Sequence, residues 1–521
     1  MNLQPQRGVI LDCRGRVLAA SNKVQTIFAE PRVIKDAKTT SSELAPIVDI
    51  GAHIICQQIL ESNNPGFVRI ITNADASQCN AARKIYGIGI QSEWQRHYPM
   101  GRLASNLVGF TSRLDNKGLE GVELKYDKEL RGSSARNIFL ADAYRRPIRA
   151  KQQDGVLTNG VGIILTIDAT IQQFTRDQLI KQYLEYEAES AVAIVAEPRS
   201  GAILAMVSLP DFDPADRTTD PNNFRSRAIT DWYEPGSILK PIAVAIALDA
   251  GVVNRTEKIF CENGSYSGRY NGEGFGRIGE YRRGFGDLTV KEILINSSNI
   301  GMAKIGQRLG KDRLYDGLRL FGFGRKTGIE LPGEIEGLLR PPHTWDGFSI
   351  TRIPYGQEIC VTGMQLIRAF CILANGGRLV RPFMVRAVVD NDGKITELKR
   401  PPPPVGYIIK PDVAEWVVRE AMAGVVNEGT GKRAQLEKWQ VFGKTGTANI
   451  ARSDARGYSD SDYVASFISG APADDPAIVV LVSVHKPNRS LGKGHTGGVV
   501  ASPVAKIIIE KTLTYLGVKP D

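Results

Sequence analysis

Alternating and continuous apolar runs predict strands at both ends of the region that follows residue 160. One run covers 162–168, and two more, at 191–198 and 201–210, are joined by a turn at Arg199–Gly201, as in a hairpin. Three further runs lie near the C-terminus, over 439–447, 463–472 and 477–484. The pattern therefore predicts a sheet built from strands that are distant along the chain.

Helical periodicity fills most of the remaining chain. It covers 169–187, where Asp168 is a candidate N-cap, and 502–516 at the C-terminus. The stretch 232–380 is also mostly helical, but its glycine-rich segment 264–286 predicts a loop. These patterns predict an α+β fold, in which an antiparallel sheet carries a helical insertion and the last helix packs on the sheet.

The first 160 residues predict a separate, irregular α+β domain. Short apolar runs such as GFVRIIT (66–72) alternate there with turn residues and polar helical stretches. The polar segment 151–160 is typical of a boundary, and the proline block at 401–404 predicts a second exposed connection. We therefore expect one domain over residues 1–160 and another over residues 161–521.

Composition narrows the class of protein. The chain has 521 residues, of which 42% are hydrophobic and 23% charged, as in a folded protein of two or three domains. The net charge of +10 favours anionic partners such as nucleic acid, acidic lipid or a cell-wall polymer. Six cysteines without a CxxC pair do not support a zinc ribbon or a thioredoxin-like site. No apolar run is long enough to predict a transmembrane helix.

Three patterns resemble cofactor motifs but lack the context that those motifs need. GFGRIG (274–279) fits GxGxxG, yet it falls in the predicted loop, without a strand before it or a helix after it. GKT (443–445) lacks the glycine of a Walker A motif, because Lys438 stands where that glycine is needed. Five histidines without an HExxH motif do not support a zinc hydrolase.

A lysine at the start of an apolar run gives the first chemical signal. Pro235 and Gly236 predict a sharp turn into a helix that begins at Ser237, so that Ser237 and Lys240 share one helix face. The following run is apolar all round, and burial lowers the pKa of a lysine by up to about 3–5 units. A neutral amine within hydrogen-bond reach of a hydroxyl is a general base for a serine nucleophile. Taken alone, SxxK favours an ordinary helix start, because the pattern occurs by chance in many chains.

Two further motifs make the pattern specific. Ser297 and Asn299 form an SxN turn at a helix end, where a hydroxyl can pass protons and an amide can hold a peptide. A KTG motif lies on a predicted strand, where lysine and threonine can bind a carboxylate and glycine allows close approach of a substrate backbone. Its residues are Lys444, Thr445, Gly446 and Thr447. The order SxxK, SxN, KTG is the set found in penicillin-binding proteins and serine β-lactamases.

The chain resembles the class B penicillin-binding proteins, the monofunctional D,D-transpeptidases of peptidoglycan synthesis, along nearly its whole length. RGVILDCRGRVLA (7–19) and LVGFTSRLDNKGLEGVELKYDKELRG (107–132) resemble the family's N-terminal pedestal. FDPADRTTDPNNFRSRAITDWYEPGSILKP (212–241) and FGFGRKTGIELPGEIEG (321–337) resemble its penicillin-binding domain. The segment 463–484 is more similar to the division-type, septal enzymes than to the elongation type.

This resemblance implies a pedestal domain followed by a transpeptidase domain of the serine β-lactamase-like fold. It also implies that Ser237 attacks the penultimate D-Ala carbonyl of a stem peptide while Lys240 takes its proton. Ser297 and Lys444 would relay that proton to the leaving D-Ala amine, and Asn299 would orient the peptide.

The same resemblance assigns the KTG motif to substrate binding. Thr445, Gly446 and Thr447 would hold the terminal carboxylate and adjoining backbone, and the N–H groups of Ser237 and Thr447 would form an oxyanion hole. No metal or cofactor is implied. The implied partners are peptidoglycan stem peptides, β-lactams as covalent inhibitors, a membrane glycosyltransferase and other division proteins. The implied location is the outer face of the cytoplasmic membrane, with an N-terminal anchoring helix that the present sequence lacks.

Several alternatives stay open at this point. An elongation-type transpeptidase would share all three motifs. A serine β-lactamase or β-lactam sensor would share them too but needs a means of deacylation, and no ExxLN-type element is visible. A non-catalytic wall-synthesis scaffold would keep the fold alone. Nucleic-acid binding rests only on the basic charge, without a reader motif and with 7% aromatic residues.

Overall fold

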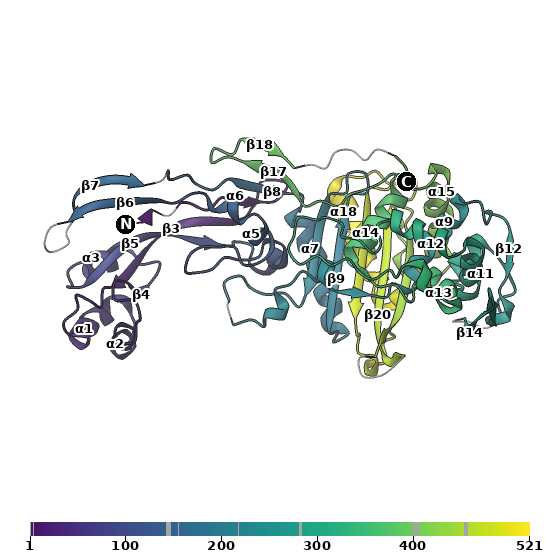
Figure 1. The fold of residues 1–521 in the computed structure, drawn as a ribbon, viewed down its shortest axis with the longest axis horizontal. Coiled ribbons are helices and arrows are strands. Elements are labelled where there is room, and N and C mark those ends of the chain that lie inside the picture. Colours follow the sequence, from purple (N-terminus) through teal and green to yellow (C-terminus); the bar gives the residue numbers. More distant parts are fainter. Residues whose placement is uncertain are drawn as a thin grey trace.

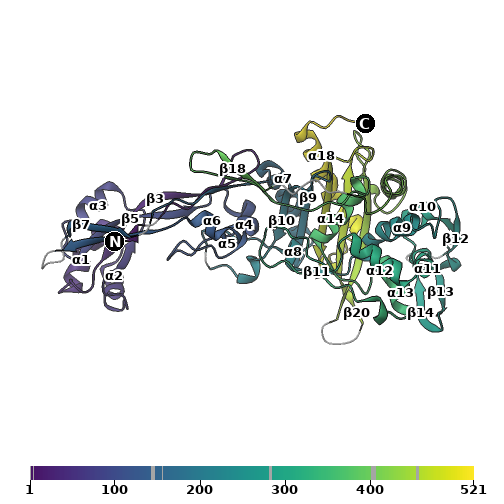
Figure 2. The same cartoon turned by 45° about the horizontal axis from the view of Figure 1, so that its top comes forward.

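The computed structural model describes residues 2–3, 5–141, 147–154, 156–216, 218–280, 284–399, 406–452 and 457–521. Figure 1 shows an elongated molecule, with the first part of the chain at one end and the sheet that contains β9 and β20 toward the other. The turned view in Figure 2 shows the same separation. Within the described residues, no helix has both the length and the apolar character needed to cross a bilayer.

One end of the molecule is a small head built around the long strand β3 (Val17–Ala29). β3 pairs antiparallel with β4 (Val68–Ile71) and β5 (Ile88–His97). Three helices complete the head: α1 (Ala37–Val48), α2 (Ala52–Leu60) and α3 (Ala76–Ala82). These elements share a hydrophobic core of their own, and the strand predicted from GFVRIIT is confirmed as β4.

A connecting sheet joins the head to the rest of the molecule. Its strands, in order from the far edge, are β18 (Ile395–Leu398), β17 (Val385–Val389), β8 (Gly162–Leu165), β2 (Ile10–Leu11) and β3. Strands from both sides of residue 160 therefore share one sheet, and the division at residue 160 stays a prediction. Residues 151–154 lie in β7 (Pro147–Asp154), which pairs with β6 (Ala135–Ala141). The proline block at 401–404 lies outside the described residues.

The predicted antiparallel sheet is confirmed as the central layer of the second part. Its five strands, in order, are β10 (Ile203–Leu209), β9 (Ser190–Ala196), β21 (Ile478–His485), β20 (Tyr458–Ala471) and β19 (Phe442–Ala451). All seven residues of β9 are buried, and alternate ones enter different cores: Ile194 on one face, Ala193 and Val195 on the other. Successive side chains of a strand point to opposite faces, so this sheet is covered on both sides.

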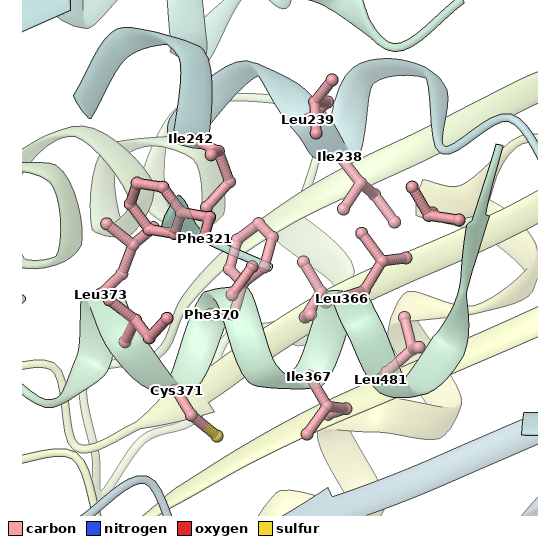
Figure 3. Close-up of a cluster of buried hydrophobic side chains, with 14 of the residues drawn as sticks. Ile238, Leu239, Ile242, Phe321, Leu366, Ile367, Phe370, Cys371, Leu373 and Leu481 are labelled. Atoms are coloured by element: carbon pink, nitrogen blue, oxygen red, sulfur yellow. The ribbon is translucent and has the colours of Figure 1, made fainter. Parts of the chain in front are cut away.

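Helices cover both faces of this sheet. α7 (Ala169–Glu185) and α18 (Ser502–Leu516) pack on one face, and both begin where the sequence predicts. Asp168 is the N-cap of α7, since its carboxylate accepts a 2.9 Å hydrogen bond from the Thr170 N–H. On the other face, α14 (Gly363–Ala374) packs between the sheet and α9 (Lys240–Asp249). Figure 3 shows Leu366 and Phe370 of α14 in one cluster with Ile238, Ile242 and Leu481.

The loop predicted over 264–286 is wrong, because much of that segment is a hairpin. β13 (Ser265–Tyr270) pairs antiparallel with β14 (Glu273–Gly279). Asn271 and Gly272 between them have φ values of 50° and 86°, and Asn-Gly is a strong signal for a tight hairpin turn. Phe275 and Ile278 anchor the hairpin in the main core. GFGRIG is therefore a hairpin strand, a context that does not suit a dinucleotide site.

Candidate active site

The segment around Ser237 forms the predicted sharp turn into a helix. Residues Gly236–Leu239 form a 3-10 turn that continues directly into α9. Gly236 has a φ of 53°, and its N–H donates a 3.0 Å hydrogen bond to Gly356 O. The side chains of Ile238 and Leu239 are fully buried, whereas Ser237 is half-buried and lines a cavity. The apolar neighbours thus anchor the turn while the Ser237 hydroxyl faces open space.

Lys240 is fully buried and makes three hydrogen bonds. Its Nζ donates to Ser297 O at 2.6 Å, to Ser297 Oγ at 3.2 Å and to Asn299 Oδ1 at 2.7 Å. These bonds use every donor of an ammonium group. The predicted hydrogen bond to the Ser237 hydroxyl is not among the bonds that the described residues make. Lys240 instead joins the SxxK helix to the SxN turn.

The burial of Lys240 changes its proton affinity. Burial lowers the pKa of this lysine to about 7, and the Glu280 carboxylate acts in the opposite direction. A lysine with such a pKa is neutral in a large fraction of molecules near neutral pH. Its setting is therefore that of a general base.

The hydroxyl of Ser297 links both lysines of the three motifs. Lys444 Nζ donates to Ser297 Oγ at 3.0 Å and to Thr445 O at 3.2 Å. Ser297 has a φ of 56°, a left-handed conformation that costs a non-glycine residue energy. Burial and the nearby Lys240 charge hold the pKa of Lys444 well below its usual value. Two lysines with lowered pKa values thus share one hydroxyl.

Asn299 is held from two sides. Its Oδ1 accepts from Lys240, and its Nδ2 donates to Gly279 O at 3.1 Å. Its backbone N–H donates to Glu280 Oε2 at 2.8 Å. Asn299 is the first residue of α11 (Asn299–Leu309), and Gly279 and Glu280 come from the end of the β13–β14 hairpin.

The KTG motif lies on β19, directly beside the Ser237 turn. A side chain at Gly446 would meet Ile238 Cγ1 at 2.9 Å and Pro235 O at 3.0 Å, so only glycine permits this approach. The Thr447 hydroxyl accepts a 3.1 Å hydrogen bond from the Gly497 N–H, which leaves its own O–H free to donate. Thr445 shares a 2.6 Å hydroxyl–hydroxyl bond with Thr430. Thr445 and Thr447 line the same cavity as Ser237.

The cavity has a volume of about 630 Å³ and brings the three motifs together. The predicted residues on its wall are Ser237, Ser297, Asn299, Thr445 and Thr447. Lys240 and Lys444 lie behind this wall, fully buried. The Ser237 hydroxyl, two buried amines and two threonine hydroxyls therefore meet at one opening, an arrangement that can support acyl transfer.

Two acidic residues that support the site could not be predicted from the sequence. Glu280 holds the SxN turn, but it lies in the segment 264–286, for which the sequence predicts a loop. Glu234 lies three residues before Ser237 and accepts hydrogen bonds from the Glu358 N–H (2.9 Å) and the Tyr458 hydroxyl (3.1 Å). Burial raises the pKa of Glu234. Its position beside the nucleophile turn was the only available signal.

Comparisons with known proteins show which family the chain belongs to. A model of the penicillin-binding protein transpeptidase domain matches residues 191–510, and one of the penicillin-binding protein dimerisation domain matches residues 2–161. Stage V sporulation protein D of Bacillus subtilis is 34% identical over 99% of this chain and 79% of its own length. Peptidoglycan D,D-transpeptidase FtsI of Escherichia coli K12 is 29% identical over 99% of this chain and 84% of its own.

A solved structure has the same fold. Penicillin-binding protein 3 of Mycobacterium tuberculosis, complexed with aztreonam, has a TM-score of 0.77 and 25% identity, covering 100% of this chain and 98% of its own. The fold and the site define a serine transpeptidase of the penicillin-binding type with an N-terminal dimerisation domain. The chain belongs to the penicillin-binding protein transpeptidase family, among relatives of the class B type.

Proposed function

We propose that this chain is a peptidoglycan D,D-transpeptidase that cross-links stem peptides through an acyl-enzyme on Ser237. The observation that carries the proposal is the shared hydroxyl of Ser297, which accepts from Lys240 and Lys444 at the wall of the cavity that Ser237 lines. β-Lactams would acylate the same serine and block the reaction.

In the proposed acylation step, Ser237 Oγ attacks the penultimate D-Ala carbonyl carbon and its proton passes to neutral Lys240. Neutral Lys240 keeps only two N–H groups, so it cannot donate all three of its present hydrogen bonds. The third position becomes a lone pair, and in the proposed step the amine turns so that this lone pair accepts the Ser237 proton. Collapse of the tetrahedral intermediate breaks the peptide bond, and Ser297 and Lys444 deliver a proton to the leaving D-Ala amine.

Charge that develops on the substrate needs fixed donors. The Ser237 N–H lies in the first turn of its helix, where N–H groups lack an intrahelical partner, and it would form the oxyanion hole with the Thr447 N–H. The free O–H of Thr447 and the hydroxyl of Thr445 suit the terminal carboxylate. In the second half-reaction, the amine of a neighbouring stem attacks the acyl-enzyme and releases Ser237.

The cellular role follows from the same proposal. Peptidoglycan cross-linking takes place at the outer face of the cytoplasmic membrane, and we place the enzyme there. The similarity of segment 463–484 to division-type enzymes supports a septal role, with a membrane glycosyltransferase as the source of new strands. A fluorescent fusion that labelled the side wall instead of the septum would favour the elongation type.

The activity is tested by incubating the protein with a pentapeptide donor and an acceptor amine. Release of D-Ala together with formation of the cross-linked product is expected, and Ser237→Ala should abolish both. Rapid hydrolysis of β-lactams without a cross-linked product would point to a β-lactamase. Absence of both reactions would favour the scaffold alternative.

A further inference from the structure

Glu280, at the end of the β13–β14 hairpin, caps the SxN turn. Its carboxylate accepts a close hydrogen bond from the Ser298 hydroxyl and further bonds from the N–H groups of Asn299 (2.8 Å) and Ile300 (3.0 Å). The two N–H groups belong to the first turn of α11, an end of a helix that attracts negative charge. Gly279, the preceding residue, adds its carbonyl as the acceptor of Asn299 Nδ2.

The turn that Glu280 holds is the turn that binds Lys240. All three acceptors of the Lys240 amine lie within residues 297–299. Ser297 keeps a left-handed backbone there, which needs support from its surroundings. Glu280 also lines the cavity, so its negative charge lies at the site itself.

We propose that Glu280 is a positioning residue that fixes the SxN turn against Lys240 and, through its charge, sets the pH range in which Lys240 acts as a base. The inference rests on the proposed function. The proposal also gives a function to the β13–β14 hairpin, which contains GFGRIG, because this hairpin places Glu280 at the active site.

The charges around these two groups give the proposal its direction. The charge of Glu280 acts on Lys240, and the charge of Lys240 acts on Lys444. The ring of Tyr355 lies 6.0 Å from Lys240 Nζ. Glu280 raises the pKa of Lys240, whereas burial lowers it. On its other side, the Glu280–Ser298 pair contacts Cys261, whose thiol also lies near Lys304. Removal of the Glu280 charge should therefore make Lys240 neutral at lower pH.

The test is the pH profile of acylation by benzylpenicillin, measured by stopped flow for the wild type and for Glu280→Gln. Glutamine keeps an acceptor but removes the charge. We expect the acid limb of the profile to move to lower pH by about one unit, because an opposite charge nearby raises the pKa of a lysine by an amount of this order. Glu280→Asp, which withdraws the carboxylate by one methylene, should move the limb in the same direction by less.

Two control variants separate this effect from a loss of structure. Ser298→Ala removes one partner of Glu280 but keeps the charge, so the rate should fall about three- to tenfold at every pH with the limb unmoved. Glu262→Gln removes a carboxylate that pairs with Lys304 at 2.6 Å and does not contact Lys240, and it should change neither rate nor limb.

Each outcome bears on one claim. An acid limb that stays in place in both Glu280 variants, while the wild type is acylated normally, overturns the role of Glu280. A shift in Glu262→Gln equal to that in Glu280→Gln also overturns it, because the effect would then be nonspecific. A wild type that is not acylated at any pH overturns the proposed function and, with it, this inference.

Discussion

The amine of Lys444 donates a 3.0 Å hydrogen bond to the hydroxyl of Ser297, although 147 positions separate the two residues in the chain. The strand β19 carries Lys444, and a turn before α11 carries Ser297. The same hydroxyl accepts from Lys240 on α9. This one oxygen therefore joins the three motifs in a single hydrogen-bonded group.

Loss of the Ser297 hydroxyl should disconnect the two lysines. We expect Ser297→Ala to slow acylation about 10²- to 10⁴-fold, the range typical of general acid–base groups. Ser297→Gly should slow it equally while leaving the melting temperature at or above that of Ser297→Ala, because glycine tolerates the φ of 56°. Near-normal acylation in both variants would show that protons do not pass through this hydroxyl.

The lowered pKa of Lys240 predicts how acylation depends on pH. Below about pH 7 the amine is protonated and cannot accept the Ser237 proton, so the rate should rise with pH through this value and then level off. Lys240→Arg should remove the reaction across the whole range, because a guanidinium stays protonated. A wild-type rate that does not change between pH 5 and pH 9 would contradict the assignment.

The turn Gly236–Leu239, which carries Ser237, depends on the close approach of Gly356. A Cβ there would lie 2.0 Å from Gly236 O, and the φ of 86° also disfavours any other residue. Gly356→Ala should therefore displace the turn, with a loss of stability of about 1–3 kcal/mol and a large loss of acylation. Gly274→Ala is the matched control, since a Cβ at Gly274 meets nothing within 4 Å. In thermal melts and acylation assays, Gly356→Ala should lose stability and rate, whereas Gly274→Ala should keep both.

Glu234 ties the nucleophile turn to two other segments. Glu234→Ala leaves the Glu358 N–H and the Tyr458 hydroxyl without their acceptor, which should cost about 1–3 kcal/mol in stability. Gln357 and Tyr355, which lie next to Glu358 in the chain, line the cavity, so the acylation rate should fall as well. Glu234→Gln keeps an acceptor and should retain most of the stability and most of the acylation rate. Tyr458→Phe should lose only part of each. Equal effects of alanine and glutamine would contradict a hydrogen-bonding role.

Much of the fold could be predicted from local patterns. The helix after Asp168 and the strands around Ile194 and Leu481 follow from a capping residue and from continuous apolar runs, which depend on near neighbours. The hairpin that ends at Gly279 could not be predicted, because its many glycines and arginines favour a loop more strongly than the Asn-Gly turn and the two buried side chains of β14 favour a strand. The sharing of one sheet by β2, β8 and β17 depends on contacts between distant segments, which no local pattern encodes.

The active site, like the fold, could be predicted from the sequence only in part. The motif residues could be identified because their spacing is specific, and the structure brings Lys240, Ser297, Asn299 and Lys444 into one hydrogen-bonded group. The spacing of SxxK could not predict the hydrogen-bond acceptors of Lys240. It places Ser237 close to Lys240, whereas the amine donates to oxygens of the SxN turn. Glu280 could not be found at all, since a lone acid in a supposed loop carries no local signal.

The most direct measurement is the intact mass of the protein after incubation with benzylpenicillin, followed by peptide mapping. The account predicts one stable adduct per chain, located on the peptide that contains Ser237 and absent from Ser237→Ala. An unmodified wild type, or an adduct that persists in Ser237→Ala, would contradict it.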